Sequence, residues 1–239
     1  MDTETSGSGD TVVIIPALNE EASIGKVLAD IPRDGIAEVI VVDNGSSDGT
    51  AAAARRAGAA VLTEPRRGYG YACMTGIARA TERSVPIIAF LDGDYSDYPE
   101  DLNLVLRPIR TEGYDMVIGS RMMGEREPGA MLPQGVFGNW LATSLIRLFW
   151  GARFTDLGPM RAIRREALER LRMREPAYGW TVEMQIKAAR TGLRSTEVPV
   201  RYRKRIGESK VTGTLSGTLK AGTRILFVIA RSFISPRTP

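Results

Sequence analysis

Short apolar segments alternate with longer segments of mixed polarity along the first half of the chain. Four of the apolar segments have the length and character of buried strands, namely residues 11–16, 38–43, 60–63 and 87–91. The segments between them predict helices, because they are rich in alanine or repeat apolar residues every three or four positions; these helices are 21–31, 51–57 and 70–80. Such alternation is typical of right-handed βαβ units. We therefore expect an α/β fold with a mostly parallel sheet flanked by helices in a single domain.

Polar and glycine-containing loops follow each predicted strand at its carboxyl end. They are the segments 16–20, 43–46, 66–70 and 92–94. Ligands of open parallel sheets bind beyond the carboxyl ends of the strands. The four loops are therefore expected to converge on one crevice, and this convergence is stronger evidence for a site than any single motif.

Two carboxylates, Asp92 and Asp94, follow the fourth predicted strand at positions i and i+2. In an extended chain these side chains point the same way and can share one cavity, while Gly93 between them lets a ligand approach the backbone. Their hard oxygen atoms suit Mg²⁺ or Mn²⁺ that is still partly coordinated by water and by substrate phosphates. The motif is short and common, so the ordinary solvation of acids at a strand end explains it equally well by itself.

The composition is that of one globular domain without histidine. The 239 residues are 43% hydrophobic and 25% charged, which suffices to bury one full core. The absence of histidine excludes His-containing triads, His general bases and His metal ligands. Cys73 is the single cysteine and cannot form an internal disulfide, so a reducing cytoplasm is the expected compartment.

Three segments are expected along the chain. Residues 1–10 are polar and lack the apolar core of a signal peptide, so we expect a disordered tail there. Residues 11–212 contain the strands, helices and motifs of the predicted domain. Residues 213–239 are expected to form a C-terminal amphipathic helix and tail.

Charge is distributed unevenly between the two halves. Residues 1–139 contain 12 Lys and Arg against 21 Asp and Glu, whereas residues 140–239 contain 20 against 7. An acidic, metal-binding region beside a basic region suits a donor that arrives with a metal and an acceptor or surface that is anionic. Solvated arginine-rich helix faces are the alternative, and we prefer that interpretation for the run from Arg161 to Arg174.

An ordered set of motifs connects these features. It consists of the segments 15–20 (IPALNE), 41–50 (VVDNGSSDGT), 68–72 (GYGYA), 91–94 (LDGD), 119–121 (GSR), 155–158 (TDLG), 197–200 (EVPV) and 205–210 (RIGESK). Together these motifs resemble the family 2 glycosyltransferases of GT-A fold over roughly residues 11–212. The last two motifs, at 197–200 and 205–210, are similar to those of the branch that transfers sugars to polyprenyl phosphates, the dolichol-phosphate mannose and glucose synthases. The resemblance implies a GT-A, Rossmann-like sheet.

The resemblance also implies where a nucleotide-sugar donor binds. The donor-binding residues carried over from the family are Pro16, Leu18, Glu20, Asp43, Gly45, Gly68, Asp92 and Gly93. Asp94, with Asp92, would ligate the Mg²⁺ or Mn²⁺ that bridges the diphosphate. A capping role in a turn is the alternative for Asp43. Residues 94–100 (DYSDYPE) stand where dolichol-phosphate mannose synthases tend to have a glutamine and a histidine before the prolines, so Ser96 is a candidate replacement for a side-chain ligand and the remaining coordination is left open.

The phosphates of donor or acceptor are expected to contact basic and hydroxyl side chains, for which the candidates are Arg121, Arg205, Ser209 and Lys210. Arginine can clamp a phosphate with two hydrogen bonds, and lysine acts as a point charge. A solvated edge strand explains the neighbouring Arg201 and Arg203 equally well. Nucleic acid is not an expected partner, because no aromatic stacking platform or known binding module accompanies the basic run.

The candidate catalytic residues beside Asp94 are Glu183 and Asp156. Glu183 stands where the family often carries an acid that deprotonates a sugar hydroxyl, and Asp156 is a second candidate for contact with the donor sugar. If the acceptor is a lipid phosphate, its second pKa of about 6 leaves it largely ionised at neutral pH, and no strong base is needed. Glu183 would then orient donor or acceptor; a helix-surface position is its alternative.

Membrane contact is expected from amphipathic helices, because no segment approaches the roughly 20 apolar residues of a spanning helix. Residues 139–150 and 215–233 are both mostly apolar with interspersed basic residues, and such helices can lie in the membrane interface. Packing on the sheet explains the first pattern equally well, but the resemblance favours the membrane. The enzyme would then be peripheral on the cytoplasmic face of the membrane.

The expected activity is the metal-dependent, inverting transfer of glucose or mannose from a UDP- or GDP-sugar to a polyprenyl phosphate. One alternative is a glycosyltransferase with a soluble or other lipid acceptor. Another is a sugar-1-phosphate nucleotidyltransferase, which should show a Gly-rich loop followed by Arg and Lys after the first strand; residues 16–20 do not supply one. A non-catalytic binding module is a third. The sequence leaves the oligomeric state open.

Overall fold

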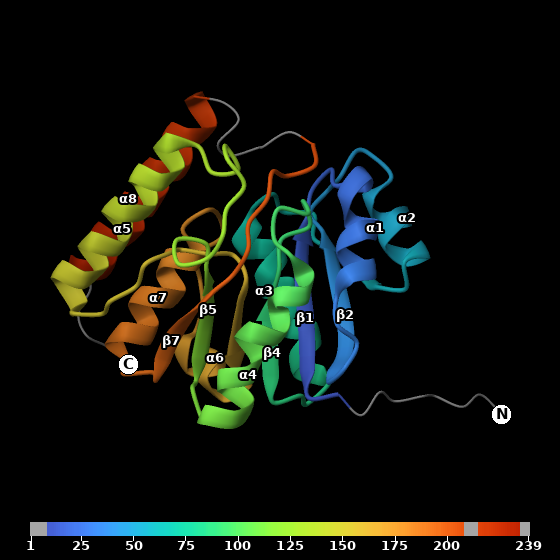
Figure 1. The fold of residues 1–239 in the computed structure, drawn as a ribbon, viewed down its shortest axis with the longest axis horizontal. Coiled ribbons are helices and arrows are strands. Elements are labelled where there is room, and N and C mark those ends of the chain that lie inside the picture. The colour runs from blue at the N-terminus through green and yellow to red at the C-terminus, as the bar shows by residue number, and fades with distance from the viewer. Residues whose placement is uncertain (1–8, 208–214, 235–239) are drawn as a thin grey trace.

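The computed structural model describes residues 9–207 and 215–234, and these form a seven-stranded sheet with helices on both faces (Figure 1). The strands are β1 (Thr11–Ala17), β2 (Ile36–Asp43), β3 (Ala60–Thr63), β4 (Ile87–Phe90), β5 (Met116–Ser120), β6 (Arg161–Arg164) and β7 (Ser195–Pro199). Their order in the sheet is β3-β2-β1-β4-β6-β5-β7. All neighbours are parallel except β6, which runs antiparallel to β4 and β5. The predicted single-domain, mostly parallel α/β fold is confirmed.

The helices cover the sheet according to the alternation of side chains along its strands. They are α1 (Glu21–Asp30), α2 (Thr50–Arg56), α3 (Tyr69–Glu82), α4 (Leu102–Glu112), α5 (Pro133–Trp150), α6 (Arg165–Leu171), α7 (Trp180–Arg190) and α8 (Leu215–Ile234), with a 3₁₀ turn at Pro99–Asp101. In the central strand β1, Val13 and Ile15 pack with α1 and α4, whereas Val12 and Ile14 pack with α3, α6 and α7. Every residue of β1 is buried, because helices cover both faces of the sheet.

A third apolar cluster joins α5, α7 and α8 beyond the edge of the sheet. Its buried members come from all three helices and from Leu157 in the loop after α5: Ala142, Ile146, Leu157, Val182, Ile186, Val228 and Ile229. Figure 1 shows α5 and α8 side by side along one flank of the molecule. Only one face of α8 is needed for this packing, and its opposite face exposes large apolar side chains. No helix among the described residues is both long and apolar enough to span a bilayer.

Two local expectations need correction. The strand expected at 87–91 ends at Phe90, so Asp92 and Asp94 lie in the following loop and not on an extended strand. The interpretation of Arg161 to Arg174 as a solvated helix face is wrong at its start. Arg161 lies on β6 and is fully buried, with its guanidinium donating to the carbonyl oxygens of Leu157 and Gly158. Burial in the sheet lowers its pKa to about 10.

The described residues include only part of the expected boundaries between tail, domain and C-terminal helix. Asp10, which the sequence places in the N-terminal tail, donates its backbone N–H to Gly35 and pairs with Arg110 at 2.6 Å. Residues 1–8 and the boundary between domain and tail at 212–213 lie outside the described residues. The expected C-terminal amphipathic helix corresponds to α8.

Candidate active site

A crevice of about 440 Å³ opens at the carboxyl ends of β1, β2 and β4. The four loops expected to converge all contribute to its walls. The predicted donor residues that line it are Pro16, Leu18, Glu20, Gly68, Asp92 and Gly93, and the predicted metal ligand Asp94 and the phosphate candidate Arg205 join them. The convergence of these loops follows from topology, because parallel strands deliver their carboxyl ends to one edge of the sheet.

Asp92 and Asp94 both line the crevice although they lie on a loop. Burial and the nearby Asp94 raise the pKa of Asp92 to about 7, and Tyr69 donates a 3.1 Å hydrogen bond to its carboxylate. One oxygen of Asp94 accepts the backbone N–H and the hydroxyl of Ser96, at 2.9 and 2.6 Å. Two carboxylates held this close favour either a shared proton or a bound cation.

Arg205 connects the two ends of the domain inside the crevice. Its guanidinium lies 2.9 Å from Glu20 and 3.1 Å from the second carboxylate oxygen of Asp94. The neighbouring Ile206 donates its backbone N–H to the carbonyl oxygen of Asp94. The segment after β7 is therefore fastened directly to the loop that carries the acidic pair, and a cationic group faces the place where Asp92 and Asp94 concentrate negative charge.

In the loop after β2, the residue that lines the crevice is Asn44 and not the predicted Asp43. Asp43 is buried and accepts the backbone N–H of Ser46, which fits its alternative role as a turn cap, and it is not among the lining residues. Asn44 lines the crevice instead. Its amide donates to the carbonyl oxygen of Arg66 at 2.7 Å and accepts the N–H of Gly68 at 2.8 Å. Gly45 turns the chain with φ of +80°.

A tight contact closes the crevice on the side of α3. At Gly68, where φ is +148°, a Cβ atom would come within 2.3 Å of the carbonyl oxygen of Pro176. Tyr71 donates its backbone N–H to that same oxygen at 3.1 Å. The glycine therefore permits the segment 175–178 to lie against the start of α3. Ala177 and Tyr178 then line the crevice from this segment.

Arg121 and Asp156 lie together behind the crevice wall and are not among its lining residues. Asp156 is fully buried and accepts three hydrogen bonds from Arg121, at 2.7 and 2.8 Å from the guanidinium and 2.8 Å from the backbone N–H. Both carboxylate oxygens of the nearby Asp97 are buried without a hydrogen-bond partner, and burial raises the pKa of this group. The role that these contacts indicate for Asp156 is to fix the position of Arg121.

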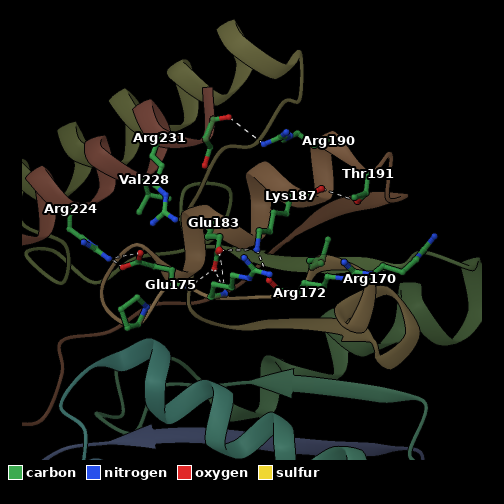
Figure 2. Close-up of a pocket in the computed structure, with 14 residues that line it drawn as sticks. Arg170, Arg172, Glu175, Glu183, Lys187, Arg190, Thr191, Arg224, Val228 and Arg231 are labelled. Atoms are coloured by element: carbon green, nitrogen blue, oxygen red, sulfur yellow. Dashed lines mark hydrogen bonds and ion pairs between the residues drawn. The ribbon is translucent and has the colours of Figure 1, made fainter. Parts of the chain in front are cut away.

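Glu183 belongs to a different cavity (Figure 2). Its carboxylate accepts the backbone N–H groups of Arg174 and Glu175, at 3.0 and 2.8 Å, and pairs with Lys187 at 2.8 Å. These contacts hold the segment that precedes α7. The structure therefore does not bring Glu183 to the crevice that contains Asp92 and Asp94, and the expectation of a helix-surface residue is also wrong because Glu183 is buried.

The basic segment after β7 is not an edge strand. β7 ends at Pro199, and Arg201 then makes a bidentate pair with Asp101, with a shortest distance of 2.6 Å. Arg203 stacks over the ring of Tyr95. Both side chains fasten the segment that carries Arg205 into the crevice. The remaining phosphate candidates, Ser209 and Lys210, lie outside the described residues.

Comparison with known proteins places this arrangement in a family. The model of the family described as "Glycosyl transferase family 2" matches residues 12–172, which is more than half of the chain. The chain belongs to glycosyltransferase family 2. The predicted family and the prediction of an enzyme that transfers glycosyl groups are thereby confirmed.

Several relatives of this glycosyltransferase cover most of its length. It is 39% identical over 223 residues to an uncharacterised glycosyltransferase of Mycobacterium tuberculosis, with 90% of this chain and 95% of the relative covered. It is 38% identical over 207 residues to a dolichyl-phosphate hexose transferase of Haloferax volcanii, with 84% and 86% covered. It is 33% identical over 223 residues to an undecaprenyl-phosphate mannosyltransferase of Micrococcus luteus, with 86% and 89% covered. These relatives support the expected resemblance to the polyprenyl-phosphate branch.

The fold also resembles solved structures. A glucosyl-3-phosphoglycerate synthase from Mycobacterium tuberculosis, crystallised with Mn²⁺, UDP-glucose and phosphoglyceric acid, matches with a TM-score of 0.77 and 25% identity. The match covers 96% of this chain and 81% of the synthase. The predicted GT-A arrangement of the glycosyltransferase is confirmed by this likeness.

Several lining residues of the glycosyltransferase were not predicted. They are Ala17, Asn44, Arg67, Tyr69, Ala72, Ala177 and Tyr178. Most of them stand inside or beside the quoted motifs, so their position in the sequence was available as a signal. Which of two adjacent residues faces the ligand depends on how a loop turns. A motif does not contain that information: Asp43 was predicted to line the crevice, but the adjacent Asn44 lines it.

The acidic pair of the glycosyltransferase fits a divalent cation that keeps part of its coordination from water and substrate. Among residues 9–207 and 215–234, no group of three or more Asp, Glu or Cys side chains could hold a metal by itself. Asp92 and Asp94 supply two carboxylates in the crevice; burial and Asp94 raise the pKa of Asp92, and Asp94 pairs with Arg205 at 3.1 Å. Mg²⁺ typically takes one or two protein carboxylates and completes its shell with waters and phosphate oxygens. The residues present are compatible with that mode.

Proposed function

We propose that this glycosyltransferase moves one hexose from a nucleotide sugar to a polyprenyl phosphate at a membrane surface, with Mg²⁺ or Mn²⁺. The observation that carries the proposal is the crevice itself, which brings Glu20, Asp92, Asp94 and Arg205 together at the carboxyl edge of the sheet. An apolar wall, three carboxylates and the two arginines Arg67 and Arg205 suit a sugar nucleotide, whose base is apolar and whose diphosphate needs cationic partners. The names of two relatives support the acceptor class.

The residues of the crevice divide the binding work between them. Pro16 and Leu18 offer apolar contact to the nucleoside, and the carboxylate of Glu20 offers a hydrogen-bond acceptor to its polar edges or ribose. Asp94, with Asp92, would hold the cation, which offsets the charge that builds up on the departing nucleoside diphosphate. Arg205 adds a fixed cationic donor at the same point. Ala177 and Tyr178 line the crevice from the segment before α7.

The position of Glu183 bears on the chemistry of the acceptor. Direct displacement with inversion needs an ionised acceptor on the face of the sugar opposite the leaving group. The Glu183 carboxylate pairs with Lys187 and accepts the backbone N–H groups of Arg174 and Glu175, away from the crevice. A phosphate acceptor is already ionised near neutral pH and needs no strong base. A sugar hydroxyl would need one, so the absence of Glu183 from the crevice favours the lipid phosphate.

An apolar groove offers a place for the lipid chain. It has a volume of about 830 Å³ and is lined by Met122, Met131, Val136, Phe137 and Trp140, among others. Its wall is joined to the crevice through the segment 201–205: Tyr202 donates its N–H to Glu125 beside the groove, and Arg205 lies in the crevice. A phosphate near Arg205 could therefore continue into an apolar chain that leaves along this groove.

The faces of α5 and α8 that point away from the sheet favour contact with a membrane. Phe137, Trp140 and Leu148 of α5 are 60%, 58% and 73% exposed. The exposed large apolar residues of α8 are Leu219, Leu226, Phe227, Phe233 and Ile234. Figure 1 shows the two helices adjacent, and the ring centroids of Phe149 on α5 and Phe233 on α8 lie 4.5 Å apart. Phe137 and Trp140 also line the groove. Such a surface suits the interfacial region of a bilayer.

We expect release of nucleoside diphosphate to require the lipid acceptor. A panel of UDP- and GDP-sugars is assayed with Mg²⁺ or Mn²⁺, with and without a short-chain polyprenyl phosphate, and with the chelator EDTA as the metal-free control. Transfer that depends on both lipid and metal supports the proposal and identifies the donor. If a donor is hydrolysed slowly and the lipid adds nothing, the acceptor assignment is wrong, and phosphorylated soluble acceptors are tested next.

The apolar surface of α5 and α8 predicts a second outcome. Replacing Phe137 and Trp140 together by glutamine should weaken binding to phospholipid vesicles by about tenfold or more, because each aromatic ring loses its apolar burial in the interface. Vesicle co-sedimentation measures this. Leu104→Gln is the matched control, since Leu104 is an exposed leucine, 45% accessible, on α4 away from this surface. Equal loss in the control variant would show that the surface has no special role.

A further inference from the structure

A second cavity, separate from the crevice, is strongly basic (Figure 2). We call it the basic cavity; it has a volume of about 460 Å³ and lies between α7, α8 and the segment that joins α6 to α7. Seven of its lining side chains are cationic and two are carboxylates. The cations that matter here come from all three elements: Arg174, Lys187, Arg190, Arg224 and Arg231. None of its lining residues lines the crevice.

The two carboxylates of the basic cavity already have partners. Glu175 makes a bidentate pair with Arg224, at 2.7 and 2.8 Å. Glu183 pairs with Lys187 and accepts two backbone N–H groups. Within residues 9–207 and 215–234, neither Arg174 nor Arg231 makes an ion pair. Among the described residues, the cavity therefore keeps the positive charges of Arg174 and Arg231 without a carboxylate that pairs with them.

The excess of charge is concentrated by the arrangement of α8. Arg224 and Arg231 are seven residues apart, which is two helical turns, so both lie on the same side of the helix beside Val228. Figure 2 shows these three side chains on the side of α8 that faces α7, opposite Lys187. Like charges gathered in one concavity repel one another, and the resulting potential attracts anions.

The chemistry of these side chains selects a class of anion. Guanidinium groups present several N–H donors in a planar fork that matches the oxygen atoms of phosphate. The volume accommodates more than a single phosphate group, and cations on opposite walls can contact separate groups of one ligand. We propose that the basic cavity binds a phosphate-bearing anion at a site distinct from the donor crevice. Inorganic polyphosphate and the headgroups of anionic phospholipids both present this chemistry.

The basic cavity and the crevice share one wall, the segment that joins α6 to α7. Arg174, Glu175 and Pro176 line the basic cavity, and the next two residues, Ala177 and Tyr178, line the crevice. This segment is the wall between the two spaces. The site does not depend on the identity of donor or acceptor, because its residues take no part in the proposed transfer.

Calorimetric titration with inorganic tripolyphosphate in metal-free buffer containing EDTA tests the site. We expect the charge-removing variant Arg174→Gln/Arg231→Gln to bind about tenfold more weakly than the parent chain, and the affinity of the parent to fall as salt is raised. Arg56→Gln is the matched control, since Arg56 is exposed on α2 far from the cavity. Arg205→Ala, which removes the crevice arginine that pairs with Asp94, should leave this binding unchanged.

A second arm distinguishes the sources of the phosphate. The same variants are sedimented with vesicles of phosphatidylcholine alone or with anionic phospholipid added. Binding of tripolyphosphate that the double variant loses supports a soluble ligand, and a loss confined to anionic vesicles supports a headgroup. Equal affinity of parent and double variant in both arms overturns the proposal, as does binding that Arg205→Ala abolishes.

Discussion

Replacing Asp94 by alanine is expected to lower the turnover of sugar transfer by about 10²- to 10³-fold, with the fold intact. Asp94 lines the crevice, and its side chain bonds only Ser96 and Arg205 among the described residues, so its loss removes no core contact. The physical reason is that the proposed metal site loses a carboxylate that would hold the cation at the departing diphosphate. Steady-state kinetics measure the effect, and thermal unfolding checks the fold.

Two further measurements make this prediction specific. Binding of Mn²⁺, followed by electron paramagnetic resonance in the presence of nucleoside diphosphate, should weaken in the same variant. Asp34→Ala is the control, because Asp34 is an exposed aspartate after α1 that does not line the crevice. Unchanged transfer by Asp94→Ala would remove this residue from the metal site, and unchanged Mn²⁺ binding with lost transfer would reassign it to the substrate.

Replacing Asp156 by alanine is expected to cost about 3–5 kcal/mol of unfolding free energy, because it leaves the buried guanidinium of Arg121 without its counter-ion. Asp156 is fully buried and holds three hydrogen bonds from Arg121. Urea unfolding followed by circular dichroism measures the change. The result separates the structural role from the catalytic role that the sequence suggested.

The control for this variant is an exposed acid that also pairs with an arginine. Glu169 lies one helical turn from Arg165 on α6 at 3.1 Å, and Glu169→Ala should change stability by about 0.5 kcal/mol or less, as exposed helical pairs do. A stable but inactive Asp156→Ala would contradict the structural assignment and restore Asp156 as a residue that contacts the sugar.

The order of helices and strands in the first half of the protein could be read from the sequence. Residues 11–16 and 38–43 are runs of β-branched and other apolar residues too short for helices, and they form β1 and β2 at nearly those bounds. Helix α8 was also foreseen as an amphipathic segment. These features are local, because hydrophobic period and segment length depend only on neighbours in the chain.

The structure of the second half was harder to predict from the sequence, because its strands and helices depend on contacts with residues far away in the chain. Arg161 looks solvated in a run rich in arginine, yet β6 inserts between β4 and β5 and buries it. The carbonyl oxygens of Leu157 and Gly158 satisfy the guanidinium there. A sequence pattern records the charge of a residue and not the hydrogen-bond partners that make its burial possible.

The sequence by itself determined the fold class, the loops that line the crevice and the acidic pair Asp92 and Asp94, because each follows from patterns within a few residues. Only the tertiary structure decided which side chains meet. Arg205 contacts Asp94, which lies 111 positions earlier in the sequence. Asn44 lines the crevice where Asp43 was predicted, and Glu183 lines the basic cavity and not the crevice. Such contacts arise when the sheet closes and helices pack on it, and no local periodicity encodes the direction in which a loop side chain then points.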